Sequence, residues 1–230
     1  MQHSSIVAIF ERLNAAHVRY IVVGGLAVVA HGHVRFTADL DLVLDMSPEN
    51  LRVALDTLGT LGYAPRAPVP LGRFADAEAR ESWIRDKGLT VFSLWSAAHP
   101  STEIDLFVSS PFDDFATAYS RAAWREIAAS VAVSFVSFED LVELKRAAAR
   151  PEDLLDVERL LSIRDGKPRD DRVSETQGEW EVGWNGHTLA QATRLAALPL
   201  VERIGWLEEA QLLAARLSRT AHQPRPLPDR

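Results

Sequence analysis

The segment 20–45 constrains this chain most, because it places two glycines and two aspartates between and within two apolar runs. The first run ends at Gly24 and Gly25, and the second carries Asp39 and Asp41 among leucines. Residues two apart in a strand lie on the same face, so both aspartates would point to one side and the leucines to a core. The segment therefore predicts two buried strands joined by a short helix, with two carboxylates on one open face.

The paired aspartates predict a cation site. Asp39 and Asp41 would lie about 7 Å apart, at roughly 3.3 Å per residue, and would repel each other unless a cation lay between them. Hard oxygen ligands of this kind suit Mg²⁺ or Mn²⁺. Glycines at a strand-to-helix turn let backbone N–H groups approach a phosphate. Each feature alone more often marks a tight turn or a solvated strand face, but together they indicate phosphoryl or nucleotidyl transfer.

The residues that carry a family resemblance follow one another in a fixed order. They are Gly24-Gly25, His31-Gly32, Arg35, Thr37 and Asp39-Leu-Asp41. This pattern resembles the polymerase-β-type nucleotidyltransferase superfamily, in particular the minimal bacterial enzymes related to AbiEii-type toxins of toxin–antitoxin systems. The resemblance covers about residues 5–164. The antitoxin-type minimal nucleotidyltransferases carry Gly-Ser and then Ala-Arg-Gly, whereas this chain continues with Leu-Ala, so the pattern favours the toxin-like branch.

The resemblance implies a third carboxylate on a later strand. Asp105 fits this position, because its neighbours Ile104 and Leu106 would face the core. Glu103 would lie on the same strand face and is the competing residue. We expect Asp39, Asp41 and Asp105 to serve as catalytic residues and as metal ligands.

The resemblance also implies nucleotide contacts, which we assign to Gly24, Gly25, Arg35, Thr37 and Lys145. Lys145 lies in a Leu-x-x-Leu-Lys run, where related enzymes carry a lysine near the triphosphate. The stretch from Lys145 to residue 153 resembles the K-x-x-x-x-R-x-x-D pattern of AbiEii-like proteins. A solvated helical lysine is the alternative interpretation.

Apolar periodicity predicts a mixed set of helices and strands. We expect helices over residues 5–16, 26–31, 48–61, 113–123, 137–150 and 152–164, and strands over 20–23, 39–44, 90–95, 103–108 and 131–135. Residues 65–88 should be irregular or partly helical. Ser47 and Ser137 are expected to cap the helices that follow them. The fold class is α/β, of the α+β type: a nucleotidyltransferase fold with a short mixed sheet backed by helices, plus a small helical C-terminal extension.

The composition along the chain predicts four parts. Residues 1–164 form the nucleotidyltransferase domain, and the polar, charged segment 165–183 is a linker. Residues 184–219 form a helical extension, and the proline-rich segment 220–230 is a disordered tail.

The extension should bury an apolar stripe, because so short a piece cannot build its own core. The stripe has roughly helical spacing and consists of Trp184, Leu200, Ile204, Trp206, Leu207 and Leu212. It could dock on the catalytic domain, on a second copy or on a separate protein. Its pattern P-L-x-E-R-I-x-W-L-E-E resembles small proteins predicted beside such nucleotidyltransferases. Residues 184–217 could therefore form a fused, antitoxin-like partner module or a self-association surface.

Charge and composition limit the partners. The net charge is −7, whereas proteins that grip long nucleic acids usually present a basic surface. The chain has no cysteine, which excludes disulfides and thiolate metal sites and fits a cytoplasmic protein. No apolar run approaches the roughly 18 residues that a membrane helix needs, so no membrane partner is expected.

These observations predict an enzyme that transfers NMP from an NTP to an acceptor hydroxyl and releases pyrophosphate. The acceptor stays open. The AbiEii-like residues favour a toxin–antitoxin component acting on tRNA or protein. The acidic net charge favours a cationic small molecule, as in aminoglycoside or lincosamide nucleotidyltransferases. A non-catalytic binding partner that keeps the fold is a further alternative, against which the three clustered acids argue.

Overall fold

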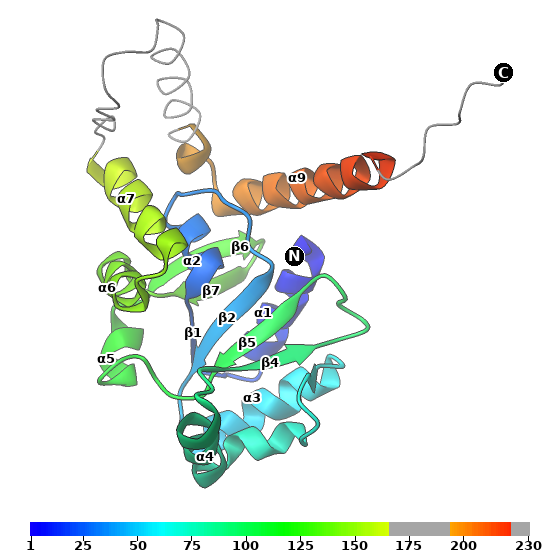
Figure 1. Cartoon of the computed structure of the whole chain (residues 1–230), viewed down its shortest axis with the longest axis vertical. Coiled ribbons are helices and arrows are strands. Elements are labelled where there is room, and N and C mark those ends of the chain that lie inside the picture. The colour runs from blue at the N-terminus through cyan, green and yellow to red at the C-terminus, as the bar shows by residue number, and fades with distance from the viewer. Residues whose placement is uncertain (166–193, 222–230) are drawn as a thin grey trace, which may run out of the picture.

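The structure is a computed structural model that describes residues 1–165 and 194–221 of the 230-residue chain (Figure 1). Almost all of the expected linker, Trp184 and the segment from residue 222 lie outside the described residues. The last helix extends to Ala221, two residues into the segment expected as a tail.

Strands and helices alternate along the chain. The strands are β1 (Tyr20–Val22), β2 (Asp39–Leu44), β3 (Ala64–Pro65), β4 (Val91–Trp95), β5 (Glu103–Phe107), β6 (Ala123–Ala128) and β7 (Val131–Phe135). The helices are α1 (His3–Ala15), α2 (Gly24–Ala30), α3 (Pro48–Thr60), the 3₁₀ helix η1 (Leu71–Ala75), α4 (Ala77–Lys87), α5 (Phe115–Ser120), α6 (Phe138–Ala148), α7 (Pro151–Asp165) and α9 (Leu200–Ala221).

All seven of these strands form one mixed sheet in the order β3-β4-β5-β2-β1-β7-β6. The central strand β2 pairs antiparallel with β1 and parallel with β5, and β1 pairs parallel with β7. Helices α1 and α3 pack together, and α6 packs on α7 and α2. The predicted mixed α/β fold is confirmed. No helix in the described parts is long and apolar enough to cross a membrane.

The sequence pattern missed the edge strand β6 and placed part of it in a helix over residues 113–123. The helix α5 is shorter, and Arg121 and residue 122 form the turn into β6. In β6 only Ile127 is buried, while residues 124–126 are exposed. An edge strand of this kind shows no alternation of apolar and polar residues, so period-two analysis does not detect it.

The two predicted serine caps have different outcomes. The Ser137 hydroxyl accepts a hydrogen bond from the Asp140 N–H, which confirms it as the cap of α6. Ser47 occupies the N-cap position of α3 as predicted, but its side chain makes no cap hydrogen bond. Its N–H instead donates to the side chain of Asp45 at 3.0 Å.

Helix α9 packs along β6 and touches α1 and α2 of the same chain (Figure 1). Leu200, Ile204 and Leu207 are buried in the common core. Trp206 and Leu212 are 41% and 53% exposed, so these two residues of the stripe are not buried against the catalytic domain, and their burial against a second chain stays a prediction.

A buried arginine joins α9 to α2. The Arg203 guanidinium donates to the carbonyl oxygens of Val29 and Ala30, at the end of α2, and its Nε donates to Leu198 O at 3.0 Å. The last carbonyls of a helix have no partner within the helix, so Arg203 supplies a donor to Ala30 O and a further donor to Val29 O, which also accepts from the Gly32 N–H.

We expect Arg203→Ala to lower the free energy of unfolding by about 2–3 kcal/mol, because buried carbonyls would lose their donors. Denaturant titration monitored by circular dichroism measures this change. Glu202→Ala, an exposed change one residue earlier on α9, is the control and should change the stability little. Equal midpoints for the two variants would contradict the assigned role of Arg203.

Candidate functional site

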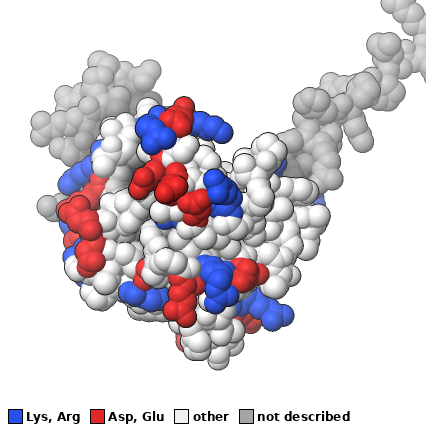
Figure 2. All heavy atoms as spheres, turned by 90° about the horizontal axis from the view of Figure 1, so that it is seen from below, with Lys and Arg blue, Asp and Glu red and all other residues white. Residues whose placement is uncertain are grey.

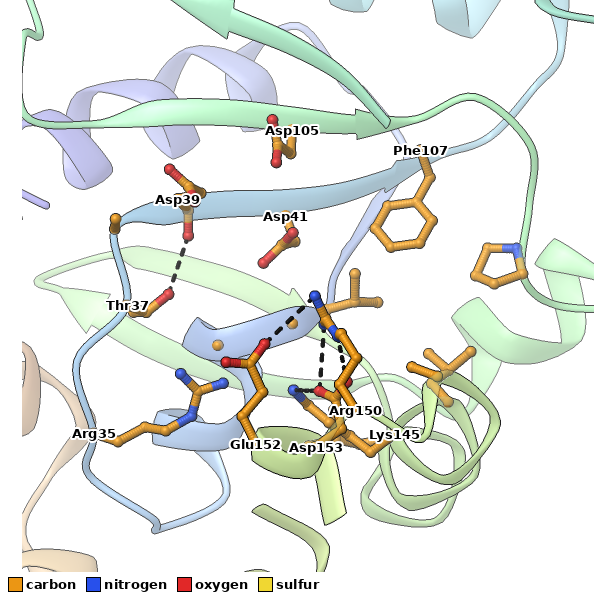
Figure 3. A pocket seen from close by; sticks show the side chains of 18 of the residues that line it. Arg35, Thr37, Asp39, Asp41, Asp105, Phe107, Lys145, Arg150, Glu152 and Asp153 are labelled. Carbon is orange, nitrogen blue, oxygen red and sulfur yellow. Dashed lines mark hydrogen bonds and ion pairs between the residues drawn. The ribbon is translucent and has the colours of Figure 1, made fainter. Parts of the chain in front are cut away.

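The register between β2 and β5 brings the acidic residues together. Asp41 pairs with Asp105 across the parallel strands, and Asp39 pairs with Glu103. Because paired residues project to the same face of a sheet, Asp39, Asp41 and Asp105 all face one side of the strand pair (Figure 3). Leu40 and Leu42 point the other way and are buried in the core.

The three aspartates line a cavity of about 500 Å³. This volume is in the range of small-molecule binding sites. All of the other residues that the sequence suggested as nucleotide contacts line the same cavity: Gly24, Gly25, Arg35, Thr37 and Lys145. The structure thus brings the predicted residues to one place, and their roles stay a prediction.

The half-buried carboxylates of Asp39 and Asp41 hold protons more tightly than usual. Burial, followed by the negative charge of Asp105, raises the pKa of Asp41 to about 6, although a hydrogen bond from the Gly25 backbone opposes this. Burial and the charges of Asp105 and Glu103 raise the pKa of Asp39 as well. A cation among these groups would favour their ionised forms.

Glu103 is engaged elsewhere. Arg66 Nε donates to Glu103 Oε2 at 2.7 Å, and a second nitrogen of the same guanidinium contacts Oε1. The hydrogen bond from Arg66 lowers the pKa of Glu103. Glu103 does not line the cavity, whereas Asp105 does. This arrangement supports Asp105 as the third carboxylate.

The two glycines leave room for the site. Helix α2 begins at Gly24, two residues before the predicted start, so both glycines belong to its first turn. Gly24 has φ +62°, and a Cβ there would lie 1.9 Å from Asp41 Oδ2. A Cβ on Gly25 would lie 2.3 Å from the hydroxyl oxygen of Thr37. A side chain at either position would therefore displace a cavity-lining residue, which explains the glycine pair by steric contact.

Lys145 forms the base of a buried charge cluster. Its Nζ lies 2.6 Å from Asp153 Oδ1 and 2.9 Å from Asp156 Oδ2. Arg35 also binds Asp156, through a hydrogen bond of 2.8 Å from Nη2 and an ion pair of 2.7 Å from Nε. The alternative that Lys145 is a solvated lysine is wrong, because the residue is buried.

The sequence pattern did not identify Arg150, Asp153 and Asp156 as residues of the site. Arg150 lines the cavity, and its Nε donates to Asp153 Oδ2 at 2.6 Å. Burial acts to raise the pKa of Asp153, but hydrogen bonds from Arg150 and Lys145 hold it below its usual value. The K-x-x-x-x-R-x-x-D pattern was the available signal for Arg150 and Asp153, since its lysine and its arginine both bind its aspartate.

His31 has a structural role. Its Nε2 lies 2.8 Å from the carbonyl oxygen of Val136, and its ring packs edge-on against Phe138. Burial lowers the pKa of His31, and the residue does not line the cavity. These contacts fix α2 against the start of α6.

The aspartates fit a divalent cation by the chemistry of their donor atoms. Within residues 1–165 and 194–221, no group of three His, Cys, Asp or Glu side chains is already gathered around a common point. Asp39, Asp41 and Asp105 nevertheless supply carboxylate oxygens from adjacent strand positions, and such ligands suit Mg²⁺ or Mn²⁺.

The raised pKa of Asp41 predicts a pH-dependent stability in metal-free buffer with EDTA. The folded protein binds this proton more tightly than the unfolded chain does. The stabilisation is therefore complete below about pH 4 and is lost as the pH rises through about 6. Relative to Asp41→Asn, which does not titrate, the wild-type protein should lose about 2 kcal/mol over this window. Denaturant titrations at several pH values measure the difference, and a constant difference between the two proteins would contradict the prediction.

Comparisons with known proteins add the following findings. Residues 4–164 match the model of the family described as "Nucleotidyltransferase of unknown function (DUF6036)". No curated protein sequence matches the chain significantly.

Two solved structures are similar over most of the chain. The crystal structure of ANT(2")-Ia in complex with adenylyl-2"-tobramycin is 14% identical, with TM-score 0.46, over 83% of this chain and 97% of that one. The solution structure of the antibiotic-resistance factor ANT(2'')-Ia is 16% identical, with TM-score 0.39, over 96% and 99%.

Proposed function

The chain belongs to the DUF6036 family of nucleotidyltransferases, and on this premise we propose that it transfers NMP from an NTP to an acceptor hydroxyl and releases pyrophosphate. The observation that carries the proposal is the place of Asp41 in one cavity, between a second carboxylate and a glycine turn. Asp41 lies opposite Asp105 on the neighbouring strand, and it closes against the glycine turn at Gly24.

Asp39 and Asp41, with Asp105 opposite, would hold a divalent cation, Mg²⁺ or Mn²⁺, which when bound neutralises charge on the triphosphate. Asp105 would accept the proton of the acceptor hydroxyl, and its position in the wall of the cavity supports this role. Glu103, with its carboxylate bound by Arg66, is not free for this task.

The other side of the cavity suits the triphosphate. Gly24 and Gly25 line the cavity there, with the Asp41 side chain against Gly24. Thr37 packs on Gly25, and its hydroxyl donates to Asp39 O at 3.3 Å. Arg35 and Lys145 contribute positive charge from their fixed places beside the buried aspartates.

For the acceptor, the charge distribution favours a small cationic molecule with a hydroxyl group. Acidic and basic side chains are interspersed on the face seen from below in Figure 2, which shows no continuous basic track there for a long nucleic acid. The net charge of −7 and the aspartates in the cavity attract cations. A toxin that modifies tRNA or protein, as the AbiEii-like pattern suggests, is the second candidate.

A labelling experiment distinguishes these acceptors. The full-length protein is incubated with each α-labelled NTP and, separately, with an aminoglycoside panel, total tRNA or cell protein, and products are identified by mass spectrometry. We expect the mass of one NMP to be added to a small cationic acceptor, only with Mg²⁺ or Mn²⁺ and not in excess EDTA. Transfer to tRNA or protein instead would establish the second candidate, and transfer to none of them would count against the proposal.

Asp105→Asn should lower kcat by about 100-fold or more, because it removes the proton acceptor and a charge while preserving shape. Glu103→Gln is the matched control, since it changes a carboxylate on the same strand face that lies outside the cavity. We expect its kcat to fall by less than about tenfold. Steady-state kinetics with the acceptor identified above measure both, and a reversed order of the two effects would move the general base to Glu103.

A further inference from the structure

Two cationic side chains at the junction of α6 and α7 line the cavity in different ways. The Lys145 side chain is 6% exposed and lies between the side chains of Asp153 and Asp156, which are 1% and 2% exposed. Moving its ammonium toward a ligand would leave buried carboxylates with fewer partners, which is costly. Lys145 is therefore held in place by its own neighbours.

Arg150 is free to move at small cost. Its side chain is 65% exposed and rests on Asp153 and, at 3.5 Å, on Glu152 Oε1. In Figure 3 the guanidinium extends from the junction of α6 and α7 into the cavity toward Asp41. If Arg150 left Asp153, this buried carboxylate would keep its hydrogen bond of 2.6 Å from Lys145.

The backbone fixes the position of the Arg150 Cα atom. Helix α6 ends at Ala148, its C-cap residue Ala149 has φ +52°, and Pro151 begins α7 directly after Arg150. A residue before proline is restricted to extended conformations, so the Cα of Arg150 has little freedom. The long side chain can therefore move while its point of attachment stays at the cavity wall.

We propose that Arg150 is the side chain that directly contacts the triphosphate of the bound NTP, and that Lys145 is a positioning residue. A guanidinium offers paired donors that match phosphate oxygens, which an ammonium does not. On NTP binding Arg150 exchanges its exposed partner Glu152 for phosphate, while Lys145 keeps Asp153 and Asp156 in place beneath it. This inference rests on the proposed function, because it assumes an NTP in the cavity.

The test measures nucleotide affinity by calorimetry with the full chain and Mg²⁺. Each of the four NTPs is titrated first, and the tightest is compared with its NMP for the wild type, Arg150→Gln and Arg146→Gln. Arg146 is exposed on α6 and does not line the cavity, so its variant removes the same charge without touching the site. Arg150→Gln should weaken NTP binding by about tenfold or more and leave NMP binding unchanged, because only the NTP carries the triphosphate that Arg150 would contact. Arg150→Lys should recover part of the loss.

The outcomes separate this inference from the proposed function. A wild-type protein that binds none of the four NTPs defeats the proposed function and this inference with it. A wild type that binds NTP, with equal affinities for Arg150→Gln and Arg146→Gln, defeats only the inference. Lys145→Gln supplies the second measurement: it should lower the melting temperature by more than Arg150→Gln does. A Lys145→Gln variant with unchanged melting temperature but lost NTP affinity would return the phosphate contact to Lys145.

Discussion

The parallel pairing of β2 with β5 is the constraint on which the site depends. A shift of one residue in this register would turn Asp105 to the core face and Ile104 or Leu106 to the cavity. The leucines and isoleucine on the reverse face prevent that shift, because they are fully buried. The position of the acidic residues is thus enforced by hydrophobic burial on the other side of the same two strands.

The second support is the pair of buried carboxylates on α7. Asp153 and Asp156 bind cations from three separate segments: Arg35 after α2, Lys145 on α6 and Arg150 at the junction. A buried ion cluster of this kind adds little net stability, but removing its buried cation, Lys145, is expensive. Its effect is to fix where α7 and the segment before β2 stand relative to the cavity.

The sequence predicted the fold class and the residues that line the cavity. It did not predict features that depend on contacts between distant segments of the chain. Asp39 and Asp41 could be placed because period two and buried leucines define a strand face. The engagement of Lys145 by Asp153 and Asp156 follows a helix–helix packing that no local pattern encodes. Strand β6 was missed since an exposed edge lacks alternation, and Arg203 was missed because its partners are backbone carbonyls far away in the chain.

Because Gly24 lies against Asp41, the residue at one of these positions limits which residues the other can accept in evolution. Any side chain at position 24 would overlap the carboxylate, so it could become established only after residue 41 had shortened or moved away. Position 24 can therefore be interpreted from a sequence alone. Among descendants of this chain, a larger residue there would indicate that the carboxylate at position 41 has been lost or displaced.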